Sequence, residues 1–180
     1  MDIQKKCGLV EILFEEIDRE ISLYQNSSGI KCAEHCRGEC CNKNDIFATV
    51  LEFIPLAFFL HSEGLADRIF TETVNAENGL CVLYLRESGK CMFYIQRGLL
   101  CRLFGFSSVR DKNGGLQVVT CRQIKSEYRE SLKSNPCNIV MSDWYRRLSA
   151  IDLHLGTELL HINEAIKTAI EQTGIFLRYR

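Results

Sequence analysis

The ten cysteines of this 180-residue chain are the residues whose type and spacing could do chemistry. Four lie within ten residues in the pattern C-x3-C-x3-C-C, three more follow at ten-residue intervals, and another comes twenty residues later. These eight are, in chain order, Cys32, Cys36, Cys40, Cys41, Cys81, Cys91, Cys101 and Cys121. Thiolates ligate structural zinc and iron–sulfur clusters. Eight of them suit two four-thiolate centres, or one cluster beside one zinc.

Composition and the first residues indicate whether these thiols are free to bind metal. The chain is 46% hydrophobic and 25% charged with a net charge of −1, which is typical of a globular protein and gives no field for nucleic acid or anionic lipid. Five acids interrupt the apolar residues of the first 24, so no signal peptide is predicted. The longest apolar stretch, 53–60, is far shorter than the ~20 residues of a membrane span. We therefore expect a cytoplasmic protein with reduced cysteines, where metal is favoured over disulfides or thiol redox chemistry.

The spacing leaves the metal open. Structural zinc commonly uses pairs of C-x2-4-C, and the x3 gaps here fall within that range although no C-x2-C occurs. On a helix, Cys32, Cys36 and Cys40 would share one face, whereas Gly38 favours a looser wrap. In an extended conformation Cys40 and Cys41 would point apart, so they would serve different centres or bridge within a polynuclear one.

Basic residues adjoin five of the eight cysteines. A cluster held by four thiolates is negatively charged, and that charge must be offset in a protein interior. The neighbours are Lys31, Arg37, Lys90, Arg102 and Arg122. The same arrangement would suit a redox thiol of low pKa, so it supports thiolates without choosing their partner.

Two further motifs complete the pattern: G-x-C-x2-Y at 89–94 and R-x3-C-R-x-F at 97–104. With the eight cysteines in order, the chain resembles the YkgJ-like cysteine-cluster family, described as a zinc- or iron-chelating CxxCxxCC domain or as an Fe–S-cluster-containing protein. The resemblance covers Cys32 to Cys121 and implies that all eight cysteines are metal ligands. Two departures are the first gap, one residue longer than C-x2-C, and Arg97-Gly98 where the family has Arg-Pro. The first alters the approach of Cys32, and the second loosens the turn into Cys101.

Other residues near the pattern have two interpretations each. Arg97 and Arg102 are predicted to bind the cofactor by donating to cluster sulfurs, or else to pair with acids on the first helix. His35 is a further ligand or a solvated loop residue. Cys7 and Cys137 fall outside the pattern, and we expect both to be small buried hydrophobic residues.

The elements that must position these residues are mostly helical. We expect an α-rich α+β fold, in which helices flank an irregular cysteine-rich metal-binding core with a short β-hairpin. One domain, 1–180, is predicted, with its core at about 31–122 and helical flanks at about 9–25 and 139–172. Within it, the apolar spacing predicts helices over 9–24, 45–60 (Pro55 marking a kink or a start), 64–74, 139–155 and 158–172, with a break at Gly156-Thr157. A hairpin is predicted from 80–85 and 91–95, and an extended piece at 116–124.

We therefore predict a cytoplasmic metal-binding protein carrying one or two iron–sulfur clusters, 4Fe-4S in type, that acts in electron transfer or as an accessory or maturation factor with a protein partner. No nucleic acid or membrane partner is expected. The alternative is a zinc-stabilised structural or interaction module. A third hypothesis is part of a methyltransferase-like enzyme, because a flagellin lysine N-methylase has a similar cysteine pattern within a longer chain. No P-loop, dinucleotide fingerprint, G-x-S-x-G or H-E-x-x-H motif occurs, no catalytic residue is assigned, and a non-enzymatic role is favoured.

Overall fold

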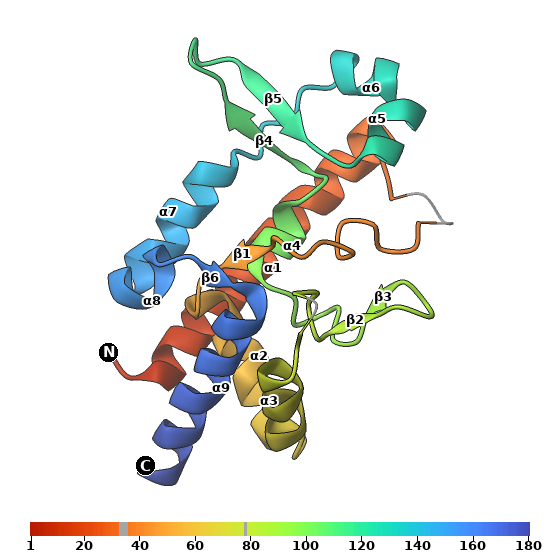
Figure 1. Cartoon of the computed structure of the whole chain (residues 1–180). Coiled ribbons are helices and arrows are strands. Elements are labelled where there is room, and N and C mark those ends of the chain that lie inside the picture. Colours follow the sequence, from red (N-terminus) through yellow and green to blue (C-terminus); the bar gives the residue numbers. More distant parts are fainter. Residues whose placement is uncertain (33–35, 78) are drawn as a thin grey trace.

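The computed structural model describes residues 1–32, 36–77 and 79–180 (Figure 1). Its helices are α1 (Ile3–Ser28), the short 3-10 helix η1 (Leu51–Phe53), α2 (Ile54–Ser62), α3 (Ala66–Val74), α4 (Leu99–Leu103), α5 (Arg122–Glu127), α6 (Arg129–Ser134), α7 (Met141–Ile151), α8 (Leu153–Thr157) and α9 (Ile162–Arg178). Its strands are β1 (Phe47–Ala48), β2 (Tyr84–Leu85), β3 (Lys90–Cys91), β4 (Ser107–Arg110), β5 (Leu116–Val119) and β6 (Leu160–His161). The expected α-rich α+β class is confirmed.

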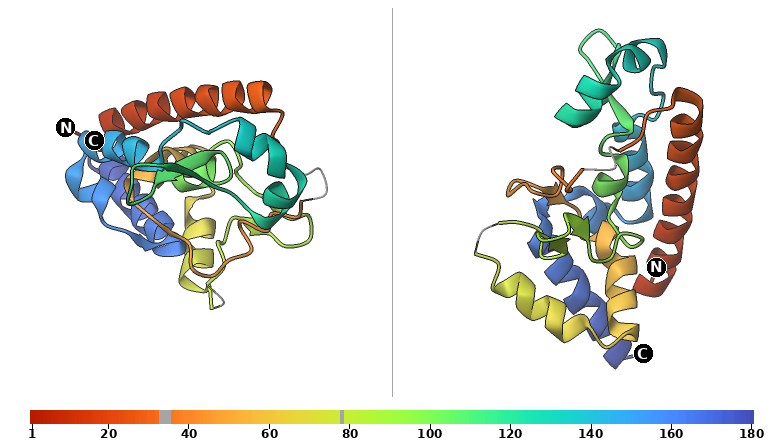
Figure 2. Two further views of the ribbon diagram at one scale, coloured as in Figure 1. Left: turned by 90° about the horizontal axis from the view of Figure 1, so that it is seen from above. Right: turned by 90° about the vertical axis from the view of Figure 1, so that its right-hand side faces the viewer.

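Helix α1 is the longest element and runs along one side of the molecule (Figure 2). It begins after Asp2, whose carboxylate accepts a hydrogen bond from the backbone N of Lys5 at 2.8 Å. It ends at Gly29, which takes the left-handed conformation with φ +71° that a helix C-cap favours. The apolar residues of its buried face, from Val10 to Ile21, enter the core. The helix predicted at 9–24 is therefore present and longer at both ends.

Two groups of helices form the core and meet at α2. Helix α9 packs against α2 and α3, while α1 packs against α2, α4 and α7. One cluster of buried apolar side chains draws on the N-terminal helix, the cysteine-bearing middle and the C-terminal helices. None of the described helices combines the length and apolar character that crossing a bilayer requires.

The described strands form three two-stranded antiparallel sheets. β1 pairs with β6, which joins the segment after the first cysteines to the start of α9. β2 pairs with β3, with Tyr84 opposite Cys91, so the predicted hairpin is present but has shorter strands. β4 pairs with β5 across a turn formed by residues 111–115.

Predicted boundaries are wrong in three regions of the chain, each for a local reason. Helix α2 begins at Ile54 instead of 45, because Pro55 lacks an N–H and suits a first turn; β1 and η1 occupy the residues before it. The extended piece ends at Val119, since the Cys121 sulfur accepts from the Ile124 backbone N at 3.5 Å and caps α5.

The third region contains the C-terminal helices. The break lies at Asp152 and not at Gly156-Thr157, which are inside α8. Asp152 is extended, and its carboxylate accepts from the Leu155 backbone N at 2.8 Å, so it ends α7 and caps α8. The last helix starts at Ile162, after β6, and not at Glu158.

Candidate metal centre

The first cysteines lie around a loop. We call Cys36–Asp45 the cysteine loop. It turns at Gly38, whose φ of +65° glycine adopts without strain, and the Gly38 carbonyl accepts from the backbone N of Cys41 at 2.8 Å and of Asn42 at 3.0 Å. Residues 36–45 therefore form a non-helical loop, the alternative that Gly38 favours over a helix. Because of this turn, the sulfurs of Cys40 and Cys41 lie 3.9 Å apart instead of pointing away from each other as an extended conformation would require.

The cysteine loop lies on the β2–β3 hairpin. The Arg37 guanidinium donates to the carbonyl of Glu87 in the hairpin turn, and the Tyr84 hydroxyl donates to the Arg37 carbonyl at 2.9 Å. Gly89 has φ +69°, and a Cβ there would lie 2.5 Å from the Arg37 backbone. The close approach of the two backbones therefore requires glycine at 89, and it places the loop beside β3, which carries Cys91.

Replacing Gly89 with alanine is expected to destabilise the fold more than the same change at Gly114. Both glycines have positive φ, but nothing lies within 4 Å of a Cβ at Gly114, so Gly114→Ala pays the left-handed strain alone, about 1 kcal/mol. Gly89→Ala adds the clash with the Arg37 backbone and should lower the free energy of unfolding by roughly 2–3 kcal/mol. Urea unfolding of both variants measures the difference, and equal costs would contradict the loop-to-hairpin contact.

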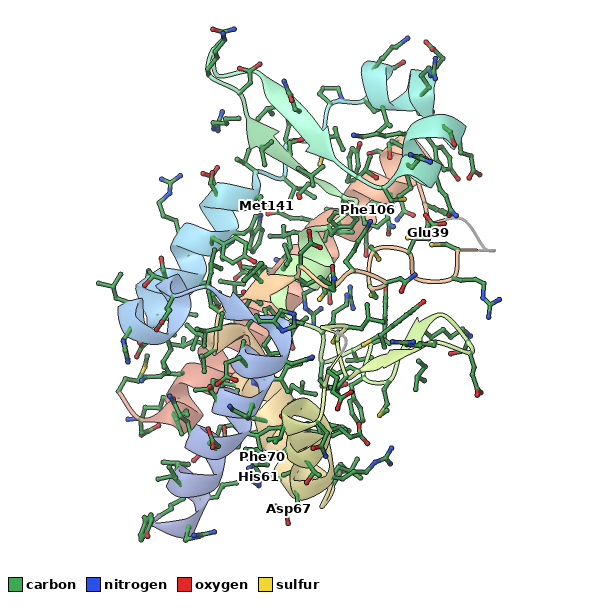
Figure 3. The ribbon with its side chains drawn as sticks, in the orientation of Figure 1. Glu39, His61, Asp67, Phe70, Phe106 and Met141 are labelled. Atoms are coloured by element: carbon green, nitrogen blue, oxygen red, sulfur yellow. The ribbon has the colours of Figure 1, made fainter. Side chains whose placement is uncertain are left out.

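The other four cysteines of the pattern come from separate places in the fold. Cys81 lies just before the turn into β2, Cys91 is in β3, Cys101 is in α4, and Cys121 caps α5. Glu39 of the cysteine loop, labelled in Figure 3, lies between α5 and the β2–β3 hairpin in that view. The loop is thus flanked by the elements that carry the later cysteines.

The charges that the thiols exert on one another define a first cysteine group. Loss of water around the Cys32 sulfur, with the negative charges of Cys36, Cys40 and Cys121, raises the pKa of this thiol to about 11. Charges shift a pKa in this way only at close range. Cys36, Cys40 and Cys121 are therefore all within electrostatic range of the Cys32 sulfur.

A second cysteine group contains Cys41, Cys81, Cys91 and Cys101. Burial, with the charge of Cys91, raises the pKa of Cys81 to about 12. Burial also raises the pKa of Cys101, and the charges of Cys81 and Cys91 add to that rise. The pKa of Cys41 is raised by its hydrogen bond with Cys40, by burial, and by the charges of Cys101 and Cys81. Cys40 adds charge at Cys91 and Cys101 as well, so it lies where the two groups meet.

These thiols form a donor set that fits a metal. For five of these thiols the pKa is raised, so losing the proton is unfavourable unless positive charge enters; they are Cys32, Cys41, Cys81, Cys91 and Cys101. The hydrogen bond with Cys41 instead lowers the pKa of Cys40 to about 7. A metal ion supplies positive charge and deprotonates its thiol ligands. In residues 1–32, 36–77 and 79–180, no three Cys, His, Asp or Glu side chains stand close enough to hold a metal ion in the conformation described. A bound metal would have to draw the sulfurs of each group together.

Arg97 and Arg102, the predicted cofactor-binding residues, both turn to the first helix. Arg97 Nη2 lies 3.1 Å from Asp18 Oδ1, and Arg102 pairs with the other carboxylate oxygen. Of the two alternatives, pairing with an acid on α1 is therefore the one that the structure describes. Burial raises the pKa of Cys91, and the nearby charge of Arg97 opposes that rise. A direct role of the two arginines at a cluster stays a prediction.

The cysteines outside the pattern lie in the core. Cys7 is buried on α1, and Cys137 is fully buried with its sulfur 3.3 Å from the Phe106 carbonyl oxygen. Burial raises the pKa of Cys7 to about 12, which favours the neutral thiol of a small hydrophobic residue. His35, considered as a further ligand, lies outside the described residues.

Sequence reasoning missed two buried polar side chains behind the second cysteine group. Glu52 is fully buried, and its carboxylate accepts from the backbone N of Thr49 and of Leu100, both at 2.9 Å. Asn163 on α9 contacts the backbone on both sides of Cys81. Glu52 had a sequence signal, as a lone acid in an apolar stretch, whereas nothing near Asn163 in the sequence marks it.

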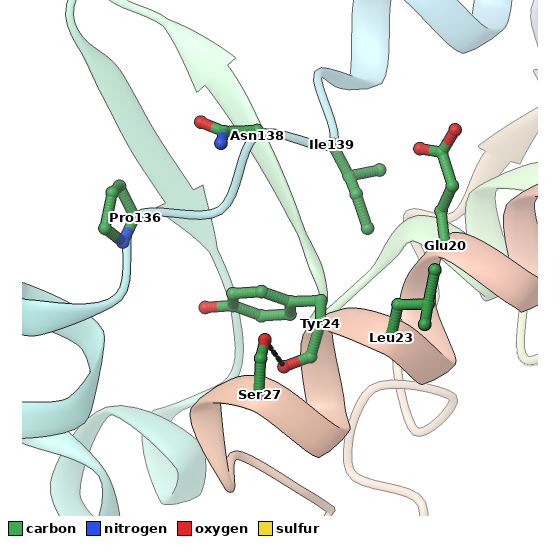
Figure 4. A pocket seen from close by; sticks show the side chains of 7 residues that line it. All are labelled: Glu20, Leu23, Tyr24, Ser27, Pro136, Asn138 and Ile139. Carbon is green, nitrogen blue, oxygen red and sulfur yellow. Dashed lines mark hydrogen bonds between the residues drawn. The ribbon is translucent and has the colours of Figure 1, made fainter.

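The described surface hollows lie away from the sulfurs. One of about 490 Å³ lies between the C-terminal half of α1 and residues 136–139, beside Tyr24 (Figure 4). Another, of about 670 Å³, lies between α1, α2 and residues 95–96. Neither is lined by a cysteine.

Comparison with known proteins gives one match. The model of the CxxCxxCC family, described as "putative zinc- or iron-chelating domain", matches residues 31–138. This interval contains all eight cysteines of the pattern and excludes Cys7, and it supports metal binding. No curated protein and no solved structure matches the chain.

Proposed function

This chain belongs to the CxxCxxCC family of zinc- or iron-chelating domains, and we propose that the metal it chelates is iron, held in one or two iron–sulfur clusters of the 4Fe-4S type. The observation that carries the proposal is the electrostatic range within which the eight thiols act on one another, in two groups of four. They come from Cys32 and the cysteine loop, from Cys81 and β3, from α4 and from the start of α5. Four cysteines are the usual ligand set of one such cluster.

The chain's own residues would hold the clusters and limit their contact with water. Cys32, Cys36, Cys40 and Cys121 would hold one cluster, and the second cysteine group would hold the other. When bound, such clusters accept and donate single electrons. Because Cys32 and Cys40 are exposed, the first site lies at the surface, where a partner protein can approach. We propose electron transfer, or an accessory or maturation role for a redox or metalloenzyme system, in the cytoplasm.

Zinc is the second candidate, favoured by the spacing of Cys40 and Cys41. Two thiolates on one tetrahedral zinc, each at about 2.3 Å from the metal, lie about 3.8 Å from each other. The observed 3.9 Å between the two sulfurs is close to that value. In this alternative the metal stabilises the packing of loop on hairpin and has no redox role.

Anaerobic purification followed by metal and sulfide analysis separates the two. The proposal expects a coloured protein with iron and acid-labile sulfide in about equal amounts, about four of each per cluster. Reconstitution with iron and sulfide, beside a parallel incubation with zinc, tests both metals on the same chain. A colourless protein with zinc at a fixed ratio and no sulfide after both treatments would overturn the iron–sulfur assignment.

A further inference from the structure

Asn163 holds the backbone on both sides of Cys81. Its side-chain oxygen accepts from the Val82 backbone N at 3.0 Å, and its side-chain nitrogen donates to the Leu80 carbonyl at 2.8 Å. The residue is 5% exposed. The Asn163 amide thus hydrogen-bonds both the backbone carbonyl before Cys81 and the backbone N–H after it.

This contact resembles the pairing of two strands. Residues 80–82 belong to no strand; the Cys81 carbonyl accepts from the Tyr84 backbone N at 3.0 Å, and the Asn163 amide binds the backbone groups on either side of Cys81. The amide of asparagine carries one acceptor and a donor group side by side, as the backbone of a neighbouring strand would. It therefore fixes the direction in which the chain presents Cys81.

Asn163 is itself held rigidly at the start of α9. Its backbone N donates to the ring of His161, and the preceding strand β6 pairs with β1. Its neighbours Ile162 and Ala165 are buried against the core. Asn163 is thus anchored to the core by its own backbone and its neighbours.

We propose that Asn163 is a positioning residue for Cys81, through which α9, outside the matched interval 31–138, takes part in the metal centre. The inference rests on the proposed function only in taking Cys81 as a ligand, whichever metal is bound. Residues that orient metal ligands typically contribute about 10–100-fold to metal affinity.

The isosteric change Asn163→Asp tests whether the hydrogen bonds of Asn163 position Cys81. It keeps the acceptor toward Val82 but sets a carboxylate oxygen against the Leu80 carbonyl, so the segment should turn away. We expect bound metal to be lost to a chelator at least tenfold faster than from the wild type. The matched control is Thr173→Val, a near-isosteric change at a buried α9 residue whose hydroxyl has no hydrogen bond among the described residues. Its rate should match the wild type.

A double-mutant comparison separates positioning from general stability. In a Cys81→Ser background Asn163→Asp should not accelerate metal loss further, because the ligand it positions is gone; in a Cys121→Ser background it should keep its effect. An equal effect in both backgrounds, no effect in the wild type, or loss of the folded state in both Asn163→Asp and Asn163→Ala would overturn the proposal.

The same measurements distinguish this proposal from the iron–sulfur assignment. The release rate is followed for whichever metal the wild type holds, with a chelator for iron or for zinc. Wild type holding zinc without sulfide would overturn the iron–sulfur proposal and leave the Asn163 test intact. Wild type that takes up neither metal would overturn both.

Discussion

Serine at Cys101 is expected to lower the metal bound by the protein by about half or more. Cys101 lies on α4 within the second cysteine group, with charges of Cys81 and Cys91 acting on it. Serine keeps the size but replaces the thiolate that binds zinc and iron with a poor ligand. Loss of half the metal would indicate two independent centres, and loss of nearly all would indicate one shared centre. Metal per chain, measured by elemental analysis, is the readout.

Two further serine variants make the Cys101 result specific. Cys40→Ser should reduce bound metal at least as strongly, because Cys40 lies where the two groups meet. Cys7→Ser should leave the metal content unchanged, since Cys7 is buried on α1 outside the pattern. Unchanged metal content after the loss of Cys101 would contradict its assignment as a ligand.

Replacing Arg102 with methionine is expected to lower the free energy of unfolding by roughly 3 kcal/mol. The Arg102 side chain is 5% exposed and pairs with Asp18, and its Nε donates to the Arg97 carbonyl at 3.0 Å. Its guanidinium also lies 4.3 Å from the ring centre of Phe14. Methionine keeps much of the packing but leaves the Arg97 carbonyl and Asp18 Oδ2 without the Arg102 donor, whereas Asp18 Oδ1 keeps its pairing with Arg97. Because Asp18 is half exposed, water recovers part of that loss, which keeps the cost below the upper end for buried pairs.

Arg147 offers a matched control for this prediction. It also pairs with an acid of α1, Glu16, and its guanidinium also lies 4.3 Å from an aromatic ring centre, that of Trp144. Both members of this pair are substantially exposed, so Arg147→Met should lower the free energy of unfolding far less than Arg102→Met does. Urea unfolding of the metal-free proteins measures both. If both variants lost a similar free energy of unfolding, the burial of Arg102 would not be what determines its contribution to stability.

The helices could be predicted where a local signal decides them. The apolar spacing of α1 is a short-range feature, and the structure confirms the helix that it predicts. Predictions failed where one residue had two possible local roles. Pro55 begins a helix instead of lying inside one, and Cys121 ends an extended piece because its sulfur caps α5. The N-terminal boundary of α2 was also hidden by β1, whose partner β6 lies more than a hundred residues away.

For the candidate metal centre too, some features could be predicted from the sequence and others depend on tertiary packing. The order and spacing of the eight cysteines, together with the basic residues beside them, indicated thiolate ligands and a family of metal-chelating domains. These properties belong to neighbouring residues and can be read along the chain. Which sulfurs are neighbours depends on the packing of the cysteine loop on the hairpin, where Gly89 permits two backbones to approach. Spacing along the chain carries no information about such an approach.

By itself, the sequence determined that this is an α-rich protein with eight ligand-like cysteines and two buried ones, because residue type and local periodicity decide those properties. Only the tertiary structure decided that Arg97 and Arg102 turn to Asp18, that Cys40 lies between two groups of sulfurs, and that Asn163 holds the backbone around Cys81. The physical reason is that hydrogen bonds and charge interactions act over a few ångströms. The residues that satisfy them here lie up to 84 positions apart in the chain.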